Sequence, residues 1–443
     1  KALYSRFYTG GVMTCIQYIT GPAGTGKTYT LAEEMINWFD NHELKDFQSI
    51  LALTRMHGSR RRLVEKLQTK NLPVRLCIRT VDSFALFIVN RWRLALDITS
   101  PIFPGEPGGF IRTDIGTQAS FSEIMQCAAA LTASPFIAQT IANKYPLILI
   151  DEFQDSIGDQ LNLLQNLKPF VDLIIAADPF QALDGDESAC NWVESSCAQE
   201  AFPINRLTVN RRSKNRYIIE AAHAVLHNQP AKYSTDKLPF LCVPSYSLAP
   251  WKVIPSRNTQ STFALIFPAQ KIFDSLWNAS MKQNQNRKAQ GKTDLPFPWR
   301  IQPSEKKRME LVKNEITGAQ PGSKIHSDIL DEAFHISKLM GFPQVTDSVL
   351  DHLISASIRQ KKLYSVNPIK YEAMTTHSAK NREFDHVFII WDNHACSNLS
   401  EDLRRRRLYN AITRAKLSCT VVVIGSKASI EACPVLSLLG TPK

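Results

Sequence analysis

A glycine-rich stretch near the start of the chain constrains the fold more than any other segment. It reads GPAGTGKT at positions 21–28, follows an apolar run at 15–20 and precedes a helical pattern at 30–39. Its three glycines allow backbone N–H groups to turn inward around phosphate oxygens, and the N-terminus of the helix adds partial positive charge. Strand, glycine loop and helix in this order predict a phosphate-binding P-loop in an α/β domain.

The same stretch supplies side chains for a nucleoside triphosphate. Lys27 can reach the β- and γ-phosphates, and the hydroxyl of Thr28 can ligate Mg²⁺. ATP and Mg²⁺ are therefore the predicted cofactors. The predicted cradle consists of Gly21, Pro22, Ala23, Gly24, Thr25, Gly26, Lys27 and Thr28.

Two carboxylates follow a continuous apolar run further along the chain. Residues 147–150 have the composition of a buried parallel strand and lead directly into Asp151 and Glu152. Downstream of a P-loop, we expect Asp151 to hold Mg²⁺ through water and Glu152 to orient and deprotonate the attacking water. The pair predicts hydrolysis of the nucleotide.

Further polar groups follow later segments. Gln181 comes shortly after an apolar run at 173–177, where it could contact the γ-phosphate or its water. A helix is predicted over 404–416, on which Arg407 and Arg414 are seven residues apart and share a face. Arg414 brought onto the phosphates would act as an arginine finger, whereas Arg404 to Arg406 are interpreted as a solvated basic helix start.

Length and composition suggest several domains and a polyanionic partner. The 443 residues favour two to four domains, and Pro and Gly give residues 98–120 the composition of a loop. A formal net charge of +11 favours a polyanion. The predicted parts are a first α/β domain (1–85 and 141–215) with an insertion at 86–140, and a second α/β domain (216–302 and 372–443) with an insertion at 303–371.

The cysteines and the hydropathy pattern narrow the class of protein. The nine cysteines include no C-x-x-C pair, so we expect reduced thiols in a cytoplasmic protein, without a zinc site or disulfide framework. No apolar run reaches the roughly 18 residues of a membrane span, and no signal peptide is visible. We therefore expect no membrane association.

Six segments, taken in order, resemble superfamily 1A helicases of the UvrD/PcrA/Rep kind. They are GPAGTGKT, DEFQD at 151–155, ADPFQ at 177–181, NRRS at 210–213, THSAK at 376–380 with Glu383 and Phe384, and YNAITRAK at 409–416. The resemblance spans nearly the whole chain. It implies an α/β fold of two RecA-like P-loop NTPase domains with parallel sheets, each carrying a small, mostly helical insertion, with ATP in the cleft between the domains.

The resemblance also implies roles for individual residues. Gln181 would sense the γ-phosphate, Arg212 and Arg414 would contact the phosphates, and Glu383 would contact the ribose. Single-stranded DNA would be contacted by Thr54, Arg55, Ser83, Phe84 and His377. Core packing explains Phe84 equally well, and a capping role explains Ser83. A solvated basic helix start is equally compatible with the segment that begins at Arg55.

One departure from the family pattern affects the expected function. Family members carry aromatic residues after the motif that contains Gln181, whereas this chain reads ALDGD at 182–186. Base–aromatic stacking contributes about 1–3 kcal/mol per base, and the two aspartates would repel phosphates. The leading hypothesis is an ATP-dependent DNA helicase or translocase, with 3′–5′ polarity implied by the resemblance. The alternative is a DNA-linked ATPase switch subunit that recruits a partner such as a nuclease in defence or repair, and RNA stays open as the nucleic acid.

Overall fold

A computed structural model describes most of the chain. The described residues are 14–54, 75–105, 107–113, 116–231, 240–253, 261–293, 298–301, 313–314, 330, 350, 354, 371–380, 382–426, 428 and 433–440. They divide into two compact units, of which the first comprises Lys1–Arg91, Ile124–Trp299 and Ala373–Lys443 and the second comprises Trp92–Glu123 and Arg300–Glu372. The six domain and insertion segments predicted from the sequence stay predictions, since compactness alone does not define them.

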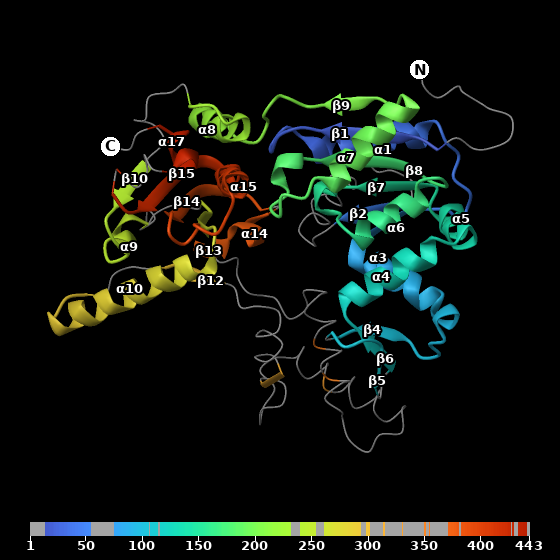
Figure 1. The fold of residues 1–443 in the computed structure, drawn as a ribbon, viewed down its shortest axis with the longest axis horizontal. Coiled ribbons are helices and arrows are strands. Elements are labelled where there is room, and N and C mark those ends of the chain that lie inside the picture. The colour runs from blue at the N-terminus through green and yellow to red at the C-terminus, as the bar shows by residue number, and fades with distance from the viewer. Residues whose placement is uncertain are drawn as a thin grey trace. The chain divides into compact units, whose positions relative to one another are not determined.

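The first unit contains a parallel six-stranded sheet built from the N-terminal half of the chain (Figure 1). The strand order is β3-β2-β7-β8-β1-β9, and each neighbouring pair is parallel. Its strands are β1 (Ile16–Thr20), β2 (Ile50–Thr54), β3 (Leu76–Thr80), β7 (Leu147–Ile150), β8 (Asp172–Ala177) and β9 (Ile204–Arg206). The helices and helical turns between them are α1 (Lys27–Asp40), α3 (Val81–Arg91), α4 (Phe121–Thr132), α5 (Pro135–Lys144), η2 (Phe153–Asp155), α6 (Asp159–Leu167), η3 (Pro179–Gln181) and α7 (Ser188–Glu200).

A second sheet follows in the C-terminal half, in the order β10-β15-β14-β11-β13-β12. Its pairs β10–β15, β14–β15 and β11–β14 are parallel. Its strands are β10 (Phe240–Val243), β11 (Phe263–Phe267), β12 (Arg300–Ile301), β13 (Tyr371–Thr375), β14 (Phe384–Asp392) and β15 (Ala415–Ile424). The accompanying helices are α8 (Arg216–His227), α9 (Ala249–Lys252), α10 (Gln270–Ala289), α14 (Thr376–Ala379), α15 (Glu401–Ile412) and α17 (Pro434–Ser437).

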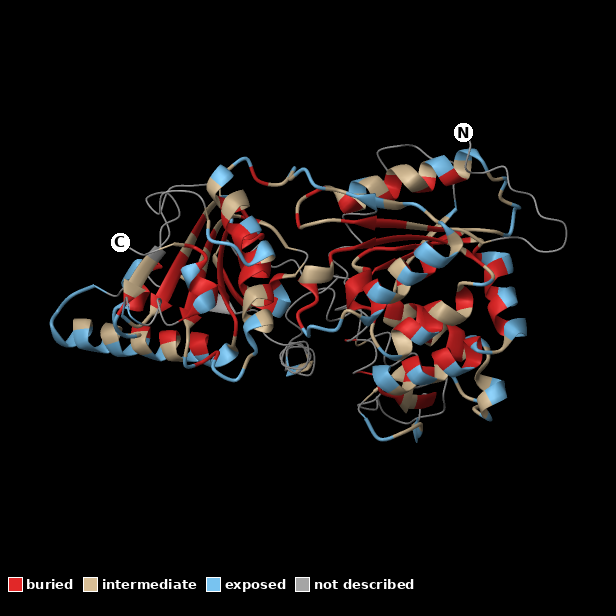
Figure 2. Ribbon diagram, turned by 45° about the horizontal axis from the view of Figure 1, so that its top comes forward, coloured by how far each residue is buried: buried red, intermediate tan, exposed pale blue. Residues whose placement is uncertain are grey.

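The two parallel sheets confirm the predicted fold class, an α/β protein with RecA-like P-loop domains. Their central strands are buried on both faces, which explains the continuous apolar runs in the sequence (Figure 2). In the first sheet, Leu31, Met35 and Trp38 of α1 pack on strand residues such as Ile19. These helix residues are three or four positions apart, so they form one apolar stripe.

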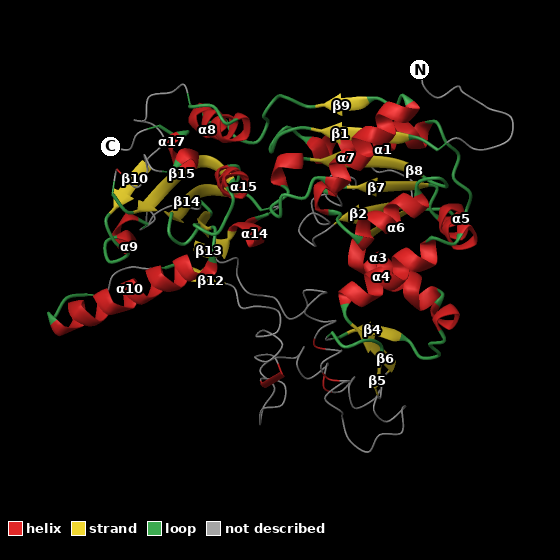
Figure 3. Cartoon of the chain, in the orientation of Figure 1, coloured by secondary structure: helices red, strands yellow, loops and turns green. Residues whose placement is uncertain are grey.

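Residues 98–120 differ from the predicted loop (Figure 3). After the helical turn η1 (Arg93–Leu96), they contain the strands β4 (Ile102–Pro104), β5 (Ile111–Thr113) and β6 (Gly116–Ala119). These form a three-stranded sheet in the order β4-β6-β5. The glycines that suggested a loop lie between or at the ends of the strands. Of the predicted insertion at 303–371, only scattered residues are described.

No single described helix has the length and hydropathy needed to cross a membrane. By length and composition alone, α4 and α5 together pass that test, but they are bent by 98°.

Candidate nucleotide-binding site

The order of the first sheet brings three functional segments to one edge. Strands β7, β8 and β1 are neighbours and run parallel, so their carboxyl ends meet. The P-loop follows β1, Asp151 and Glu152 follow β7, and the turn η3 follows β8. Ligands of open parallel sheets bind at this edge.

The P-loop needs glycine where another part of the chain approaches it. At Gly24, which has a φ of 82°, a Cβ atom would lie 2.8 Å from the Cβ of Arg212. Gly26, with a φ of 95°, precedes the first residue of α1 in a left-handed conformation. A side chain at Gly24 would combine steric conflict with backbone strain, whereas one at Gly26 would be strained by its backbone conformation alone.

Lys27 lies within the loop that it is predicted to serve. Its Nζ donates hydrogen bonds to the carbonyl oxygens of Gly21 at 2.7 Å and Pro22 at 3.0 Å. The same atom lies 3.7 Å from Oδ2 of Asp178. The ammonium group is therefore held over the loop and close to a buried carboxylate, where it can exchange carbonyl partners for phosphate oxygens.

Thr28 and Asp151 form a pair of oxygen ligands. The hydroxyl of Thr28 donates to Oδ2 of Asp151 at 3.0 Å. Burial and the neighbouring charge of Glu152 raise the pKa of Asp151 to about 6. A cation beside this carboxylate would offset that cost. The oxygen donors suit Mg²⁺, which usually takes only one or two protein ligands along with water and phosphate oxygens. The described residues contain no group of three or more His, Cys, Asp or Glu arranged to hold a metal.

Glu152 is held in an uncommon backbone conformation next to the P-loop. Its φ of 60° and ψ of 43° are left-handed, which costs about 1–2 kcal/mol for a residue with a Cβ. Gln154 Nε2 donates to its Oε2 at 2.7 Å. Burial opposes the charge of Glu152, but Lys27, the Gln154 hydrogen bond and Arg414 together lower its pKa. The side chain is therefore a carboxylate that can accept a proton.

Gln181 connects the two sheets of the first unit. Its Nε2 donates to Oδ2 of Asp178 at 2.8 Å, and its Oε1 accepts from Nη2 of Arg414 at 3.2 Å. Asp178 also accepts from the hydroxyl of Tyr409 at 3.3 Å, and that hydroxyl accepts from the backbone N–H of Ala23 at 2.7 Å. A P-loop residue, the predicted sensor and the segment that follows α15 thus belong to one hydrogen-bonded network.

The predicted placement of Arg414 on a helical face shared with Arg407 is wrong. Helix α15 ends at Ile412, and Arg414 lies in the turn that leads into β15. Its side chain is 1% exposed, and its Nε donates to the carbonyl of Asn410 at 3.0 Å. Arg407 instead donates to the carbonyl of Pro268. The turn, rather than a helical repeat, directs Arg414 into the pocket.

Arg212 and Glu383 form an ion pair at the same site. Arg212 Nε lies 3.0 Å from Oε1 of Glu383, and its Nη1 donates to the carbonyl of Thr413 at 2.9 Å. Lys416 Nζ lies 3.5 Å from Oε2 of Glu383. The predicted phosphate contact and the predicted ribose contact are therefore partners of each other in this conformation.

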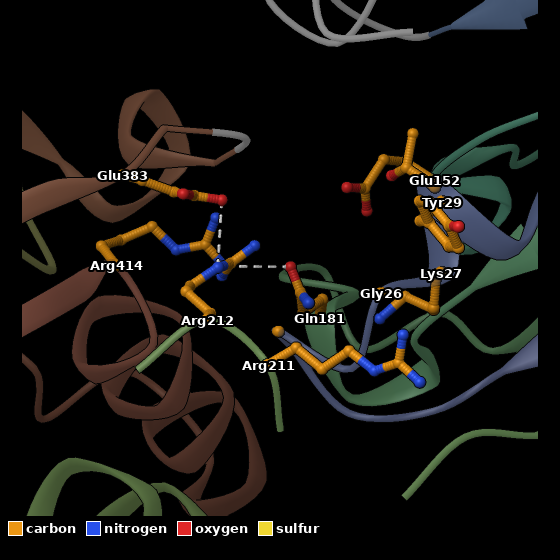
Figure 4. Close-up of a pocket in the computed structure, with 11 residues that line it drawn as sticks. Gly26, Lys27, Tyr29, Glu152, Gln181, Arg211, Arg212, Glu383 and Arg414 are labelled. Atoms are coloured by element: carbon orange, nitrogen blue, oxygen red, sulfur yellow. Dashed lines mark hydrogen bonds and ion pairs between the residues drawn. The ribbon is translucent and has the colours of Figure 1, made fainter. Parts of the chain in front are cut away.

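Residues of the P-loop, of the strand ends and of the segments around Arg212 and Arg414 line one cavity of about 480 Å³ (Figure 4). The lining residues are Gly24, Gly26, Lys27, Thr28, Tyr29, Glu152, Gln181, Arg211, Arg212, Glu383 and Arg414. Of the predicted cradle, Gly21, Pro22, Ala23 and Thr25 are not among them. Thr25 instead donates to the carbonyl of Pro22 within the loop.

Sequence reasoning missed two residues of the cavity, Tyr29 and Arg211. Each directly adjoins a residue of a recognised motif, Tyr29 after Thr28 and Arg211 before Arg212. Aromatic rings and guanidinium planes both stack on flat groups such as nucleobases. Their adjacency to the motifs was the available signal, but the motifs alone did not show that these side chains turn toward the cavity.

The predicted nucleic-acid contacts do not gather in a comparable way. Phe84 is 0% exposed and packs edge-on against Tyr145, which is the core-packing alternative, and its contact with DNA stays a prediction. Thr54 is also 0% exposed, which excludes it from the protein surface in this conformation. Ser83 exchanges hydrogen bonds with Thr80 at the start of α3, which is the capping alternative.

His377 and Arg55 complete the predicted set. The side chain of His377 is 47% exposed, and its Nε2 lies 3.8 Å from Oδ1 of Asp184. Burial and the nearby Arg407 lower its pKa, which favours the neutral imidazole. Arg55 lies outside the described residues.

The interpretation of Arg404 to Arg406 as a solvated basic helix start is wrong. Arg404 donates to the carbonyls of Cys396 and Ser397, and Arg405 donates to those of Val225 and Leu226. Arg406 is 4% exposed and donates to the carbonyls of Pro179 and Ala182 as well as to Asp402 and Glu187. These arginines satisfy main-chain oxygens of neighbouring segments.

Comparison with known proteins adds two family matches. Residues 10–185 match an AAA domain, and residues 370–422 match a UvrD-like helicase C-terminal domain. No curated protein matches the chain. Among solved structures, the arterivirus nonstructural protein 10 helicase aligns at 10% identity and a TM-score of 0.36, over 96% of this chain and 61% of that helicase. The chain thus spans less than two thirds of that protein.

The two family matches contain most of the residues that line the cavity. The AAA match contains the P-loop, the carboxylates after β7 and Gln181, and the C-terminal match contains Glu383 and Arg414. Together the two matches support a UvrD-like helicase of superfamily 1.

Proposed function

We propose that this protein hydrolyses ATP and couples the hydrolysis to movement on single-stranded DNA, in the 3′–5′ direction. The observation that carries the proposal is the composition of the cavity. Lys27, Glu152 and Gln181 reach it from the first sheet, while Arg212 and Arg414 reach it from segments associated with the second. A nucleotide bound there would contact both parts of the unit, so its hydrolysis would change their mutual contacts.

Each of these cavity residues then has a chemical role. Lys27 binds the β- and γ-phosphates, and Glu152 orients the attacking water and accepts its proton. Arg414 stabilises the charge on the transferred phosphoryl group, and Gln181, bonded to Arg414, responds to the loss of the γ-phosphate. Mg²⁺, held by Thr28 and Asp151, would neutralise part of the phosphate charge.

The proposed nucleotide contacts outside the cavity lining are the remaining P-loop residues Gly21, Pro22, Ala23 and Thr25. Their backbone groups belong to the glycine loop that surrounds phosphate oxygens. Glu383 is the proposed ribose contact, and binding would release it from Arg212.

Steady-state ATP hydrolysis with and without single-stranded DNA, and then with RNA, tests this function. We expect stimulation by DNA and loss of hydrolysis in Lys27→Ala and Glu152→Gln. Matched controls are Lys45→Ala and Glu43→Gln, which change exposed residues away from the cavity. Normal turnover in Glu152→Gln would contradict the site assignment. Displacement of streptavidin from biotin at either end of an oligonucleotide reports the direction of movement.

A second function is favoured by the segment after Gln181. Ala182 and Leu183 are buried, whereas Asp184 and Asp186 are exposed, so this segment offers an acidic surface in place of stacking aromatics. In this alternative, ATP turnover acts as a switch that recruits or releases a protein partner such as a nuclease. Hydrolysis that ignores DNA and RNA, and rises only with a protein partner, would favour the switch.

A further inference from the structure

Gln154 is a buried amide bonded at both ends of its side chain. It lies in η2, directly after the two carboxylates, and is 1% exposed. Its Nε2 donates to Oε2 of Glu152 at 2.7 Å, and its Oε1 accepts from the backbone N–H of Asp178 at 3.1 Å. The side chain therefore joins the end of β7 to the end of β8.

The two partners determine which way the amide points. The backbone N–H of Asp178 can only donate, so it selects the oxygen of the amide and turns the nitrogen toward Glu152. A carboxylate at this position could accept from Asp178, but it would bring a second negative charge against Glu152. An asparagine is one methylene shorter and would not span the same distance. The position therefore has a chemical requirement for glutamine.

The hydrogen bond restricts a side chain that would otherwise be mobile. A glutamate has three side-chain torsions, so its carboxylate can occupy many positions relative to the backbone. Fixing Oε2 leaves Oε1 to accept a proton from water at a defined place. A base gains from such pre-organisation because its geometry must match the reacting atoms.

The far end of the bridge is equally well anchored. Asp178 is 2% exposed, and its carboxylate holds Nε2 of Gln181 at 2.8 Å and lies 3.7 Å from Lys27 Nζ. One residue thus contacts the P-loop lysine, the proposed phosphate sensor and, through its backbone, Gln154. A shift of Asp178 would be transmitted to Glu152 through two hydrogen bonds.

We propose that Gln154 is the positioning residue for Glu152, holding the base in register with the segment that carries Gln181. The inference rests on the proposed function, in which Glu152 activates the attacking water. Gln154 itself is not among the residues that line the cavity, so it acts through Glu152.

ATP hydrolysis by Gln154→Leu tests the proposal. We expect kcat to fall about 10- to 100-fold, the range found for residues that orient metal ligands through hydrogen bonds, and KM to stay within about twofold. The matched control is Gln139→Leu, which changes an exposed glutamine on α5 bonded to Asn143. An unchanged kcat in Gln154→Leu, or a loss carried by KM alone, would overturn the proposal.

A double-mutant cycle separates positioning from a general structural effect. If Gln154 acts through Glu152, adding Gln154→Leu to Glu152→Gln causes no further loss of activity. Multiplicative losses would contradict the proposal. If Gln154→Leu does not fold, Gln154→Glu serves instead, because it is nearly isosteric and keeps an acceptor for Asp178. The same fall in kcat is expected.

A crystal structure of Gln154→Leu distinguishes this proposal from the function on which it rests. The proposed function fails if the wild-type protein does not hydrolyse ATP in the presence of DNA, in the presence of RNA, or without nucleic acid. In that case the position of the Glu152 side chain in Gln154→Leu still shows whether Gln154 positions it. A displaced or multiply placed carboxylate supports positioning by Gln154. A carboxylate that stays in place overturns it.

Discussion

The cavity residues and the predicted nucleic-acid contacts were inferred from the same family resemblance, yet their arrangement in the structure differs. In the cavity, Lys27, Glu152, Gln181 and Arg414 converge, and the last three are connected by hydrogen bonds through Gln154 and Asp178. In the nucleic-acid set, Thr54 and Phe84 are buried in the core, and His377 pairs with an aspartate. Phosphate chemistry requires particular groups at particular places, whereas a nucleic-acid backbone accepts many polar arrangements.

This difference indicates how each region could evolve. The cavity depends on partners that are far apart in sequence, so a single change affects several others. Contacts along a surface are more nearly independent, and one can be lost without disturbing the rest. The predictions below test whether the two regions differ in this way, beginning with the largest expected effect.

Arg414→Ala should reduce kcat for ATP by about 10³- to 10⁵-fold, the range measured for arginine fingers. The reason is that its guanidinium, bonded to Gln181, is the proposed charge on the transferred phosphoryl group. Single-turnover hydrolysis measures the effect. Arg216→Ala, at a side chain that is 84% exposed, is the control. A loss smaller than tenfold would count against Arg414 as an arginine finger. It would also mean that the cavity residues depend on one another less than their hydrogen bonds suggest.

Phe84→Ala should lower the free energy of unfolding by about 3–5 kcal/mol, because a fully buried ring is removed. DNA affinity should be unchanged at temperatures where the variant is folded. Chemical denaturation and fluorescence anisotropy measure the two quantities. Phe136→Ala, at a ring that is 75% exposed, should change stability by less than about 0.5 kcal/mol. Weaker DNA binding by folded Phe84→Ala would return this residue to the binding surface.

Tyr409→Phe should lower the free energy of unfolding by about 1–3 kcal/mol, because Ala23 N–H and Asp178 each lose a buried partner. Burial raises the pKa of Tyr409 well above its usual value, so the hydroxyl stays protonated and can donate to Asp178. Thermal and denaturant unfolding measure the change. Unaltered stability would mean that the P-loop and the second sheet are less tightly connected than the hydrogen bonds suggest.

Asp184→Asn should strengthen binding of single-stranded DNA by about two- to fivefold at low salt, because an exposed negative charge is removed from the segment after Gln181. The gain should shrink as salt is raised. Anisotropy titrations at two salt concentrations measure it, with the exposed Asp40→Asn as control. Weaker binding would show that the acidic segment faces something other than nucleic acid.

Much of the fold could be predicted because buried strands have a simple signature. The run at 147–150 coincides with β7, and the P-loop has the predicted context of β1 and α1. The sites in the cavity were predictable for the same reason, since polar residues at the ends of parallel strands meet. The small sheet β4-β6-β5 was not, because Gly and Pro dominate the composition between its short strands.

The end of α15 shows why the remaining details were out of reach. Thr413 Oγ1 and Arg414 Nε both donate to the carbonyl of Asn410, which ends the helix, and Ala415 pairs with Phe384 of β14. That strand partner is thirty-one positions earlier in the chain, so a local repeat could not reveal it. Likewise, a run of four arginines does not show which carbonyl oxygens need donors. Tyr29 and Arg211 were missed because the fold, rather than the local sequence, determines that their side chains point toward the cavity.

The four consecutive arginines of α15 also attach that helix to more segments of the second sheet than of the first. Successive helical residues point about 100° apart, so each guanidinium meets a different neighbour around the circumference. Arg404, Arg405 and Arg407 bond to segments that flank the second sheet, while Arg406 alone bonds to the turn after β8. If the two sheets move apart during turnover, α15 would move with the second sheet, and the bonds of Arg406 and Tyr409 to the segments of the first sheet would break.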